Sequence, residues 1–187
     1  MRFSELLFLA VLASIPVQLN KFFFPSFSFV LGIPIDYRAV SIYFIDILAV
    51  LLLASVAIRP PKNFFKFFKN KKSLIYTLGA LNIYLFTNAY FFSQSQTVSL
   101  LFAIKVLEFS LFCIVATYYF SQKKVFKKSQ KVIAITIVWQ SALAITQFLI
   151  QKSLGLELLG ERSFDTSTVS IAHTQIFGSQ FLRAYGT

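Results

Sequence analysis

Long apolar stretches alternate with short polar segments along the chain. A helix needs about 20 mostly apolar residues to cross a membrane. Four stretches approach or reach that length: Ile42–Ile58, Leu74–Phe92, Val98–Phe120 and Val132–Ile150. A fifth stretch, Phe3–Leu19, is shorter and contains Pro16. We therefore predict an all-α fold, a polytopic transmembrane helix bundle with five spanning helices in residues 1–150.

The first stretch also has the outline of a signal peptide, because Arg2 provides a charged start and Leu6–Ile15 an apolar region. Two features favour a helix that stays in the chain. Glu5 lies where a signal peptide would be basic, and no clear cleavage site between small residues follows. We expect an uncleaved first helix.

Two further segments are predicted to lie outside the spanning helices. Residues 22–33 (FFFPSFSFVLGI) are apolar but too short to span, and Pro25 and Gly32 interrupt them. Apolar segments of this length are typical of the membrane interface, where aromatic side chains anchor. Residues 151–187 are more polar and contain no spanning stretch, so we expect them to emerge from the membrane.

The charges of the loops predict the orientation. Arg59–Ser73 contains six basic residues and Ser121–Lys131 contains five, and neither has an acidic residue. The alternate segments are neutral or of mixed charge. Because Lys and Arg accumulate on the cytoplasmic side of a membrane protein, we predict a cytoplasmic N-terminus and an outer location for residues 151–187.

The composition agrees with a membrane protein. Apolar residues make up 57% of the chain, charged residues 13%, and the mean hydropathy is +0.71. A soluble domain has roughly 25% charged residues, so an ordinary soluble enzyme and a disordered tail are excluded. The one cysteine, Cys113, excludes an internal disulfide and a thiolate metal cluster.

The net charge of +11 would also suit nucleic acid, but the basic residues lie in loops between apolar stretches. We expect the lipid bilayer, and no nucleic acid, as the partner. The basic segments 59–73 and 121–131 are candidates for binding anionic lipid head groups, at about 1 kcal/mol for each Lys or Arg. The alternative is that they only set the orientation.

Apart from Glu5 near the start of the first helix, three charged residues fall inside the predicted helices: Asp46, Lys105 and Glu108. Charge at membrane depth costs about 2.5–3.5 kcal/mol on insertion scales, so each is a candidate functional residue. Lys105 and Glu108 share a helix face at a spacing of three residues. One interpretation is a structural ion pair, between Lys105 and Glu108 or between Lys105 and Asp46. The other is that Lys105 attracts a phosphate-bearing substrate into an outward-opening cavity.

Uncharged polar residues also recur at helical spacing. The last helix has a stripe of Thr136, Gln140, Gln147 and Gln151, and the third has Thr77, Tyr84 and Asn88. Such stripes usually face neighbouring helices, and the alternative is that they line a cavity for a sugar chain.

Catalytic and metal-binding motifs are absent from the sequence. It has no HExxH, CxxC, GxSxG or glycine-rich phosphate loop, and we predict neither a metal nor a cofactor. The one histidine, His173, is not assigned a role. Glu157, Glu161 and Asp165 have no spacing that identifies a glycosidase pair.

Three pieces of the tail carry a resemblance: Leu159–Phe164 (LGERSF), Ile171–Ala172 and Phe181–Thr187 (FLRAYGT). They resemble the bacterial O-antigen ligase/polymerase family, in which an Arg-x-x-Gly-Thr/Leu-Phe element leads into a Pro-Asn motif. Arg183–Thr187 is similar to the first half of that element. The placement of Asp46 in Ile42–Leu48 and the Lys105–Glu108 step also resemble the family's second and fourth helices.

The resemblance implies a ligase or polymerase of lipopolysaccharide biosynthesis in the cell envelope, a multi-pass protein of the bacterial inner membrane. It would transfer a glycan from a polyprenyl-pyrophosphate carrier to an acceptor on the periplasmic face, without metal or nucleotide. Arg183 is the position that carries over, as a pyrophosphate contact. His173 does not match the family's catalytic histidine. The family is longer, so we expect the chain to be truncated after the periplasmic segment 151–187 and to lack the complete active site.

Two alternatives remain open. One is a non-enzymatic membrane module, a transporter or lipid-flippase subunit that uses Asp46, Lys105 and Glu108 as a translocation pathway. The other is an inactive truncated product.

Overall fold

The structure is a computed structural model, and it describes residues 3–17, 19–35, 38–156, 173–176 and 179–182. Within these residues the chain is mainly helical, with six α-helices. The predominance of helix is therefore confirmed. The helices are α1 (Phe3–Ser14), α2 (Phe44–Ile58), α3 (Phe64–Lys69), α4 (Lys72–Phe91), α5 (Gln96–Ser121) and α6 (Lys123–Ile150).

Short antiparallel strand pairs connect some of the helices. The strands are β1 (Asn20–Phe23), β2 (Phe29–Val30), β3 (Ile33–Pro34), β4 (Val40–Tyr43), β5 (His173–Ile176) and β6 (Ser179–Leu182), with one 3-10 turn, η1 (Ser26–Ser28). Strand β1 pairs with β4, β2 with β3, and β5 with β6. In the β1–β4 pair, Asn20 lies opposite Tyr43 and Phe23 opposite Val40.

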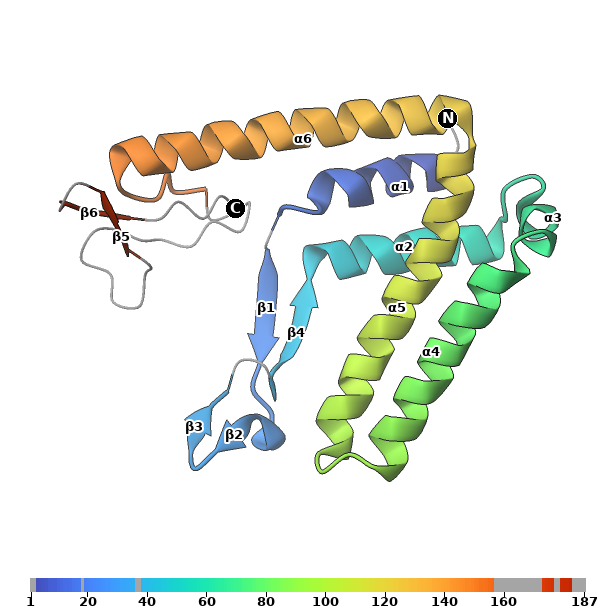
Figure 1. The fold of residues 1–187 in the computed structure, drawn as a ribbon, viewed down its shortest axis with the longest axis horizontal. Coiled ribbons are helices and arrows are strands. Elements are labelled where there is room, and N and C mark those ends of the chain that lie inside the picture. Colours follow the sequence, from blue (N-terminus) through green and yellow to red (C-terminus); the bar gives the residue numbers. More distant parts are fainter. Residues whose placement is uncertain (1–2, 18, 36–37, 157–172, 177–178, 183–187) are drawn as a thin grey trace.

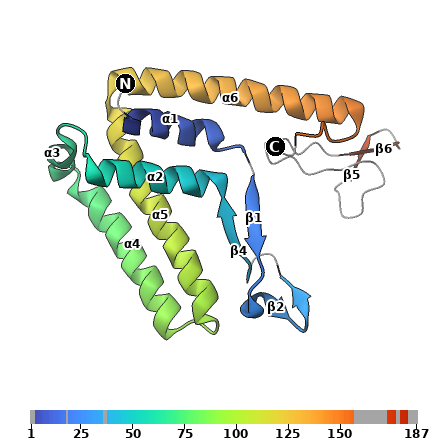
Figure 2. The ribbon, with the colours of Figure 1, turned by 180° about the vertical axis from the view of Figure 1, so that it is seen from behind.

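The helices form two groups that meet at one end of the molecule (Figure 1). Helices α1, α2 and α6 run side by side, and α1 packs on both α2 and α6. Helices α4 and α5 form an antiparallel hairpin that runs steeply across α2 (Figure 2). The β1–β4 ribbon continues from the ends of α1 and α2 toward the side where the α4–α5 turn lies.

Two helix boundaries differ for local reasons from those expected from hydropathy. Helix α1 ends at Ser14, not Leu19, because Pro16 lacks an N–H donor and disfavours helix in the residue before it. Helix α2 begins at Phe44 because Ile42 and Tyr43 pair with β1. Apolar content alone does not separate the end of a strand from the start of a helix.

Three segments predicted to lie between the spanning helices contain regular structure. Residues 22–33 form the end of β1, the turn η1 and the β2–β3 hairpin. The predicted loop Ser121–Lys131 is mostly helix, since α6 begins at Lys123. Lysine has good helix propensity and the stretch has no Gly or Pro. The basic loop Arg59–Ser73 contains the short helix α3.

The buried core lies where the two helix groups meet. Phe8 of α1 is fully buried and stacks on Tyr119 of α5, with ring centroids 4.8 Å apart. Leu52 of α2, Phe68 of α3 and Val125 of α6 belong to the same cluster. This cluster fixes one end of α1, α2, α5 and α6 together with α3, so burial of apolar surface stabilises that end of the fold.

Two helices in the described residues, α5 and α6, are long and apolar enough to span a membrane. A core helix of a soluble protein would be mostly buried, but only 17% of the apolar window of α5 and 11% of that of α6 are buried. The exposed apolar surface is typical of contact with lipid or with other chains. Helices α1 and α2 are apolar but shorter, with 12 and 15 residues. Five spans are thus not shown.

Candidate functional site

The three charged residues predicted inside the helices lie together where α2 meets α5. Asp46 is in the first turn of α2, and its Oδ2 accepts a hydrogen bond of 2.8 Å from the backbone N–H of Tyr43. The positive end of the helix dipole favours a carboxylate at this position. The sequence places Asp46 there because the β4 strand ends at Tyr43 and the helix starts at the next residue.

Lys105 connects both carboxylates. Its ammonium forms an ion pair and hydrogen bond with Asp46 Oδ2, and it lies 3.9 Å from Glu108 Oε2. The two predicted pairings of Lys105, within its helix and across to α2, are therefore both present. Asp46 and Glu108 are mostly buried, with side-chain exposures of 13% and 17%, whereas Lys105 is 35% exposed.

This arrangement leaves part of the cluster unsatisfied. Glu108 Oε1 is buried and has no hydrogen-bond partner in the described part of the chain. A buried ion pair does not by itself stabilise a fold much, because desolvation of the charges offsets their attraction. The cluster therefore holds charge beside a cavity, which makes it a candidate functional site.

A cavity of about 670 Å³ lies beside Lys105, between β4 and the α4–α5 hairpin. Arg38 lies at its edge, just before β4, and donates a hydrogen bond of 3.4 Å to Ser95 Oγ at the start of α5. Tyr84 and Asn88, two of the three polar residues predicted to share a face of the third helix, also line this cavity.

A second cavity of about 520 Å³ lies on the other side of Lys105. Asp46 and Glu108 are in its lining, and most of the rest is aliphatic or aromatic, including Val11, Ile45 and Phe112. Lys105 and Ser41 line both cavities. The lysine thus stands at the boundary between a cavity with cationic groups and one that is largely apolar.

The sequence analysis missed Arg38. It lies in a segment of mixed charge outside the predicted helices, so the hydropathy pattern does not mark it as a candidate site residue. No local signal identifies it, because its place near the start of α5 depends on the pairing of β4 with β1.

The polar stripe of α6 is partly buried. Gln147 is buried, with 1% exposure, and Thr136 and Gln140 are half-buried beside a small cavity next to α1. A similar contact joins α4 and α5, where Asn82 Nδ2 donates hydrogen bonds to Leu78 O (2.8 Å) and to Ser110 Oγ (2.9 Å). These groups fit a role in helix association.

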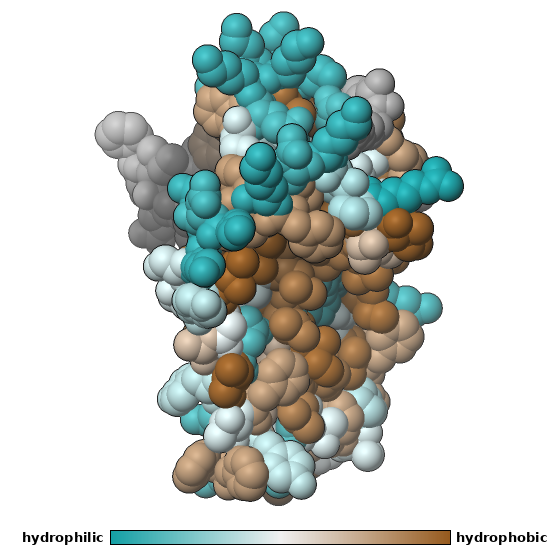
Figure 3. All heavy atoms as spheres, turned by 90° about the vertical axis from the view of Figure 1, so that its right-hand side faces the viewer, coloured by the Kyte–Doolittle hydropathy of each residue, from teal (hydrophilic) through white to brown (hydrophobic). Residues whose placement is uncertain are grey.

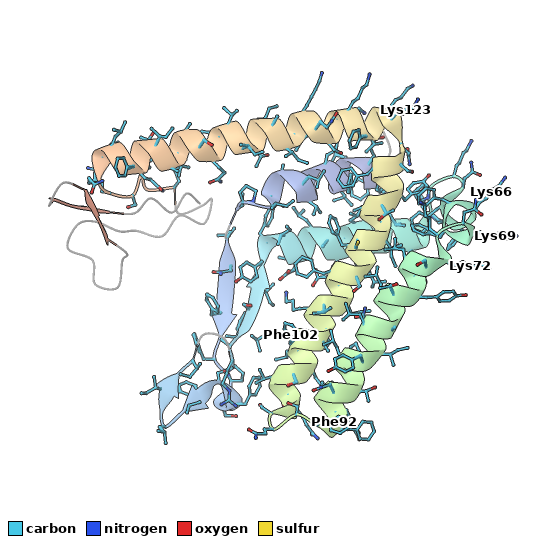
Figure 4. The ribbon with its side chains drawn as sticks, viewed as in Figure 1. Lys66, Lys69, Lys72, Phe92, Phe102 and Lys123 are labelled. Atoms are coloured by element: carbon cyan, nitrogen blue, oxygen red, sulfur yellow. The ribbon has the colours of Figure 1, made fainter. Side chains whose placement is uncertain are left out.

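The basic segments 59–73 and 121–131 gather at one end of the molecule. Tyr118 Oη donates a hydrogen bond of 2.7 Å to Lys62 O, and Lys128 pairs with Glu5 at 2.7 Å. Lys66, Lys69, Lys72 and Lys123 lie at this end, away from Phe92 in the α4–α5 turn (Figure 4). Figure 3 views the molecule from this end and shows hydrophilic residues in its upper part and hydrophobic residues below them. We call these two segments the basic end.

Several predicted positions lie outside the described residues. They are Arg183, Glu157, Glu161 and Asp165, so the structure does not place them relative to Lys105. The backbone of His173 lies in β5, opposite Leu182 of β6. Among the residues that the structure does describe, no group of three or more His, Cys, Asp or Glu side chains could hold a metal ion.

Comparison with known proteins gives no relative. No protein family, no curated protein and no solved structure matches the chain.

Proposed function

We propose that the chain is the N-terminal part of a multi-pass membrane protein of the O-antigen ligase/polymerase type. It would take part in transferring a polyprenyl-pyrophosphate-linked oligosaccharide to an acceptor on the periplasmic face of the bacterial inner membrane. The observation that carries the proposal is the position of Lys105, paired with Asp46 and Glu108 and open to a cavity away from the basic end.

The proposed topology has five membrane-spanning helices, α1, α2, α4, α5 and α6. The basic end supports it, because the start of α1, the end of α2, the start of α4, the end of α5 and the start of α6 all lie there (Figure 1). Cationic residues at that end would face the cytoplasm and its anionic lipid head groups.

The two short spans need an explanation within this topology. At about 1.5 Å per residue, α1 and α2 reach only about 18 and 22 Å, less than the roughly 30 Å of hydrocarbon. In the proposal the paired β1–β4 ribbon continues both helices into the outer interface, where water satisfies the backbone groups on its two open edges.

The proposed chemistry depends on cations near the outer surface. An acceptor hydroxyl would attack the first sugar and displace the polyprenyl pyrophosphate, whose negative charge needs stabilisation. Lys105 would attract the pyrophosphate, and Arg183 would bind its oxygens through the planar fork of a guanidinium group. Both roles for these side chains are part of the proposal.

The test is a transfer assay with the protein expressed from its complete gene and reconstituted in lipid vesicles. A labelled polyprenyl-pyrophosphate oligosaccharide and a purified glycolipid acceptor should yield labelled acceptor. Arg183→Ala should abolish the product, whereas Lys152→Ala, a basic residue close to the membrane, should not. Absence of transfer by the wild-type protein to lipid, glycan and protein acceptors would contradict the proposal.

One observation favours a second candidate, a non-enzymatic transporter or flippase subunit. Glu108 Oε1 is buried without a partner in the described residues, as expected for a group that exchanges protons or binds a passing cation. Vesicles containing the protein would then show flux of a labelled lipid or ion that Glu108→Gln removes, without any glycan transfer.

A further inference from the structure

We propose that the cavity between β4, α4 and α5 binds the phosphate groups of a membrane lipid, with Arg38 and Lys105 as its two cationic ligands. The chemistry of the lining residues indicates a phosphate-bearing lipid in general. The choice of a polyprenyl pyrophosphate as that lipid rests on the proposed function.

Arg38 supplies a cation that no carboxylate of the described residues neutralises. Its guanidinium donates to Ser95 Oγ, and no acidic side chain in the described residues lies within ion-pair distance of it. A guanidinium group has five N–H donors, so one hydrogen bond leaves most of them free for the oxygens of a ligand. Arginine is well suited to phosphate because two parallel N–H groups match two oxygens.

Lys105 supplies the second cation from a greater depth. Its carboxylate partners Asp46 and Glu108 line the neighbouring cavity but not this one. Among the described residues that line the larger cavity there are therefore two cations and no acid. With three N–H donors, the ammonium of Lys105 keeps capacity for a ligand while it is bound to Asp46.

The remaining polar groups suit an anion with several oxygens. Ser41, Tyr84 and Asn88 bring hydroxyl and amide donors to the wall. Along α5, Ser95 and Lys105 are ten residues apart, which is about 15 Å at 1.5 Å per residue. With long side chains reaching inward, this separation suits an extended anion, such as a pyrophosphate that carries a sugar, better than a single small one.

The apolar part of the wall indicates a lipid rather than a soluble phosphate. Phe102, Ile104 and Tyr84 are more than half exposed although they line the cavity. Phe102 projects from α5 toward the β4 side (Figure 4). In a membrane these exposed apolar residues would face hydrocarbon, so a lipid chain can remain in the bilayer while its head group enters the cavity. The volume of about 670 Å³ is within the usual range for ligand sites.

The first experiment measures binding of a fluorescent polyprenyl pyrophosphate to the protein in nanodiscs. Arg38→Gln is the main variant because Arg38 lies outside the buried core, and Arg59→Gln is the matched control because Arg59 is exposed at the basic end. We expect Arg38→Gln to weaken binding about tenfold or more, since hydrogen bonds to charged groups contribute about 1.5–3 kcal/mol. Arg59→Gln should bind as the wild type does.

Lys105→Gln should weaken binding similarly, provided that circular dichroism and size-exclusion chromatography show a folded protein. Equal binding by wild type and Arg38→Gln would overturn the assignment of the cavity, whatever Lys105→Gln does. If Arg38→Gln binds normally and glycan transfer by the wild type is observed, this inference fails while the proposed function stands.

Competition identifies the source of the phosphate. Unlabelled polyprenyl pyrophosphate should displace the probe better than polyprenyl monophosphate, and both better than inorganic pyrophosphate, which lacks the chain. Displacement by phosphatidylglycerol at equal concentration would support a lipid phosphate site and contradict the polyprenyl carrier, and with it the proposed function. Displacement by inorganic pyrophosphate alone would overturn the lipid assignment.

Discussion

At the scale of single residues, the charge cluster could be predicted in part. The spacing of Lys105 and Glu108 on one helix face follows from the sequence, and Asp46 was among the alternatives for pairing. That Lys105 contacts both carboxylates depends on how α2 packs on α5, which no local pattern encodes. Arg38 could not be predicted, because its place beside the cavity depends on the pairing of β1 with β4.

The first prediction concerns Asp46. Asp46→Asn removes the negative charge that Lys105 contacts and leaves the ammonium half-buried beside Glu108. We expect the free energy of unfolding to fall by about 1–3 kcal/mol, because the half-buried ammonium keeps only the longer contact with Glu108. Unfolding in detergent, followed by tryptophan fluorescence of Trp139 or by circular dichroism, measures it.

The control for this prediction is Glu5→Gln, which breaks the pair between Glu5 and Lys128 at the basic end. Lys128 is about half exposed, so this substitution should cost about 0–1 kcal/mol. Replacing both Asp46 and Lys105 by neutral residues should recover part of the loss. If Asp46→Asn and Glu5→Gln have equal effects, the cluster is not desolvated as described.

At the scale of helices and strands, hydropathy located the long elements better than their ends. Val98–Phe120 lies within α5, since a continuous apolar run favours one helix. The bounds of the shorter helices differ from the expected ones for local reasons. Pro16 ends α1 early, and the pairing of β4 with β1 moves the start of α2 to Phe44. The helix at Lys123–Lys131 could not be inferred from hydropathy, because a charged segment has the same low hydropathy whether it forms a helix or a loop.

The second prediction concerns the α4–α5 contact. Asn82→Leu removes the hydrogen bond between Asn82 Nδ2 and Ser110 Oγ inside the helix pair. We expect the free energy of unfolding in detergent to fall by about 0.6–2 kcal/mol, the range measured for polar contacts between membrane helices. Thr117→Val on α5 is the control, because its hydroxyl bonds only to Cys113 O of its own helix and should cost less.

At the scale of the whole molecule, the buried core and the basic end coincide. Phe68 of α3 and Tyr119 of α5 pack in the same cluster, so the cationic segments around them are held in fixed positions. The gathering of these segments agrees with the orientation expected from their charge. Hydropathy and charge predicted which segments share an end of the molecule, but not the steep crossing of α5 over α2 (Figure 1).

The third prediction concerns this core. Phe68→Ala removes a buried ring, which is 6% exposed in the wild type, and should cost about 3–5 kcal/mol. Phe65→Ala is the matched control on the same short helix, because Phe65 is 75% exposed and should change stability in detergent little. Equal effects of the two substitutions would show that α3 does not pack as described.

The central claim is that the basic end and the α4–α5 turn lie on opposite sides of a membrane. The accessibility of single cysteines in intact cells tests it most directly. Two variants are made in Cys113→Ala protein: Lys66→Cys at the basic end and Gln94→Cys in the turn. A membrane-impermeant maleimide should label Gln94→Cys and leave Lys66→Cys unlabelled until the membrane is permeabilised. Labelling of Lys66→Cys with protection of Gln94→Cys, or equal labelling of both, would contradict the account.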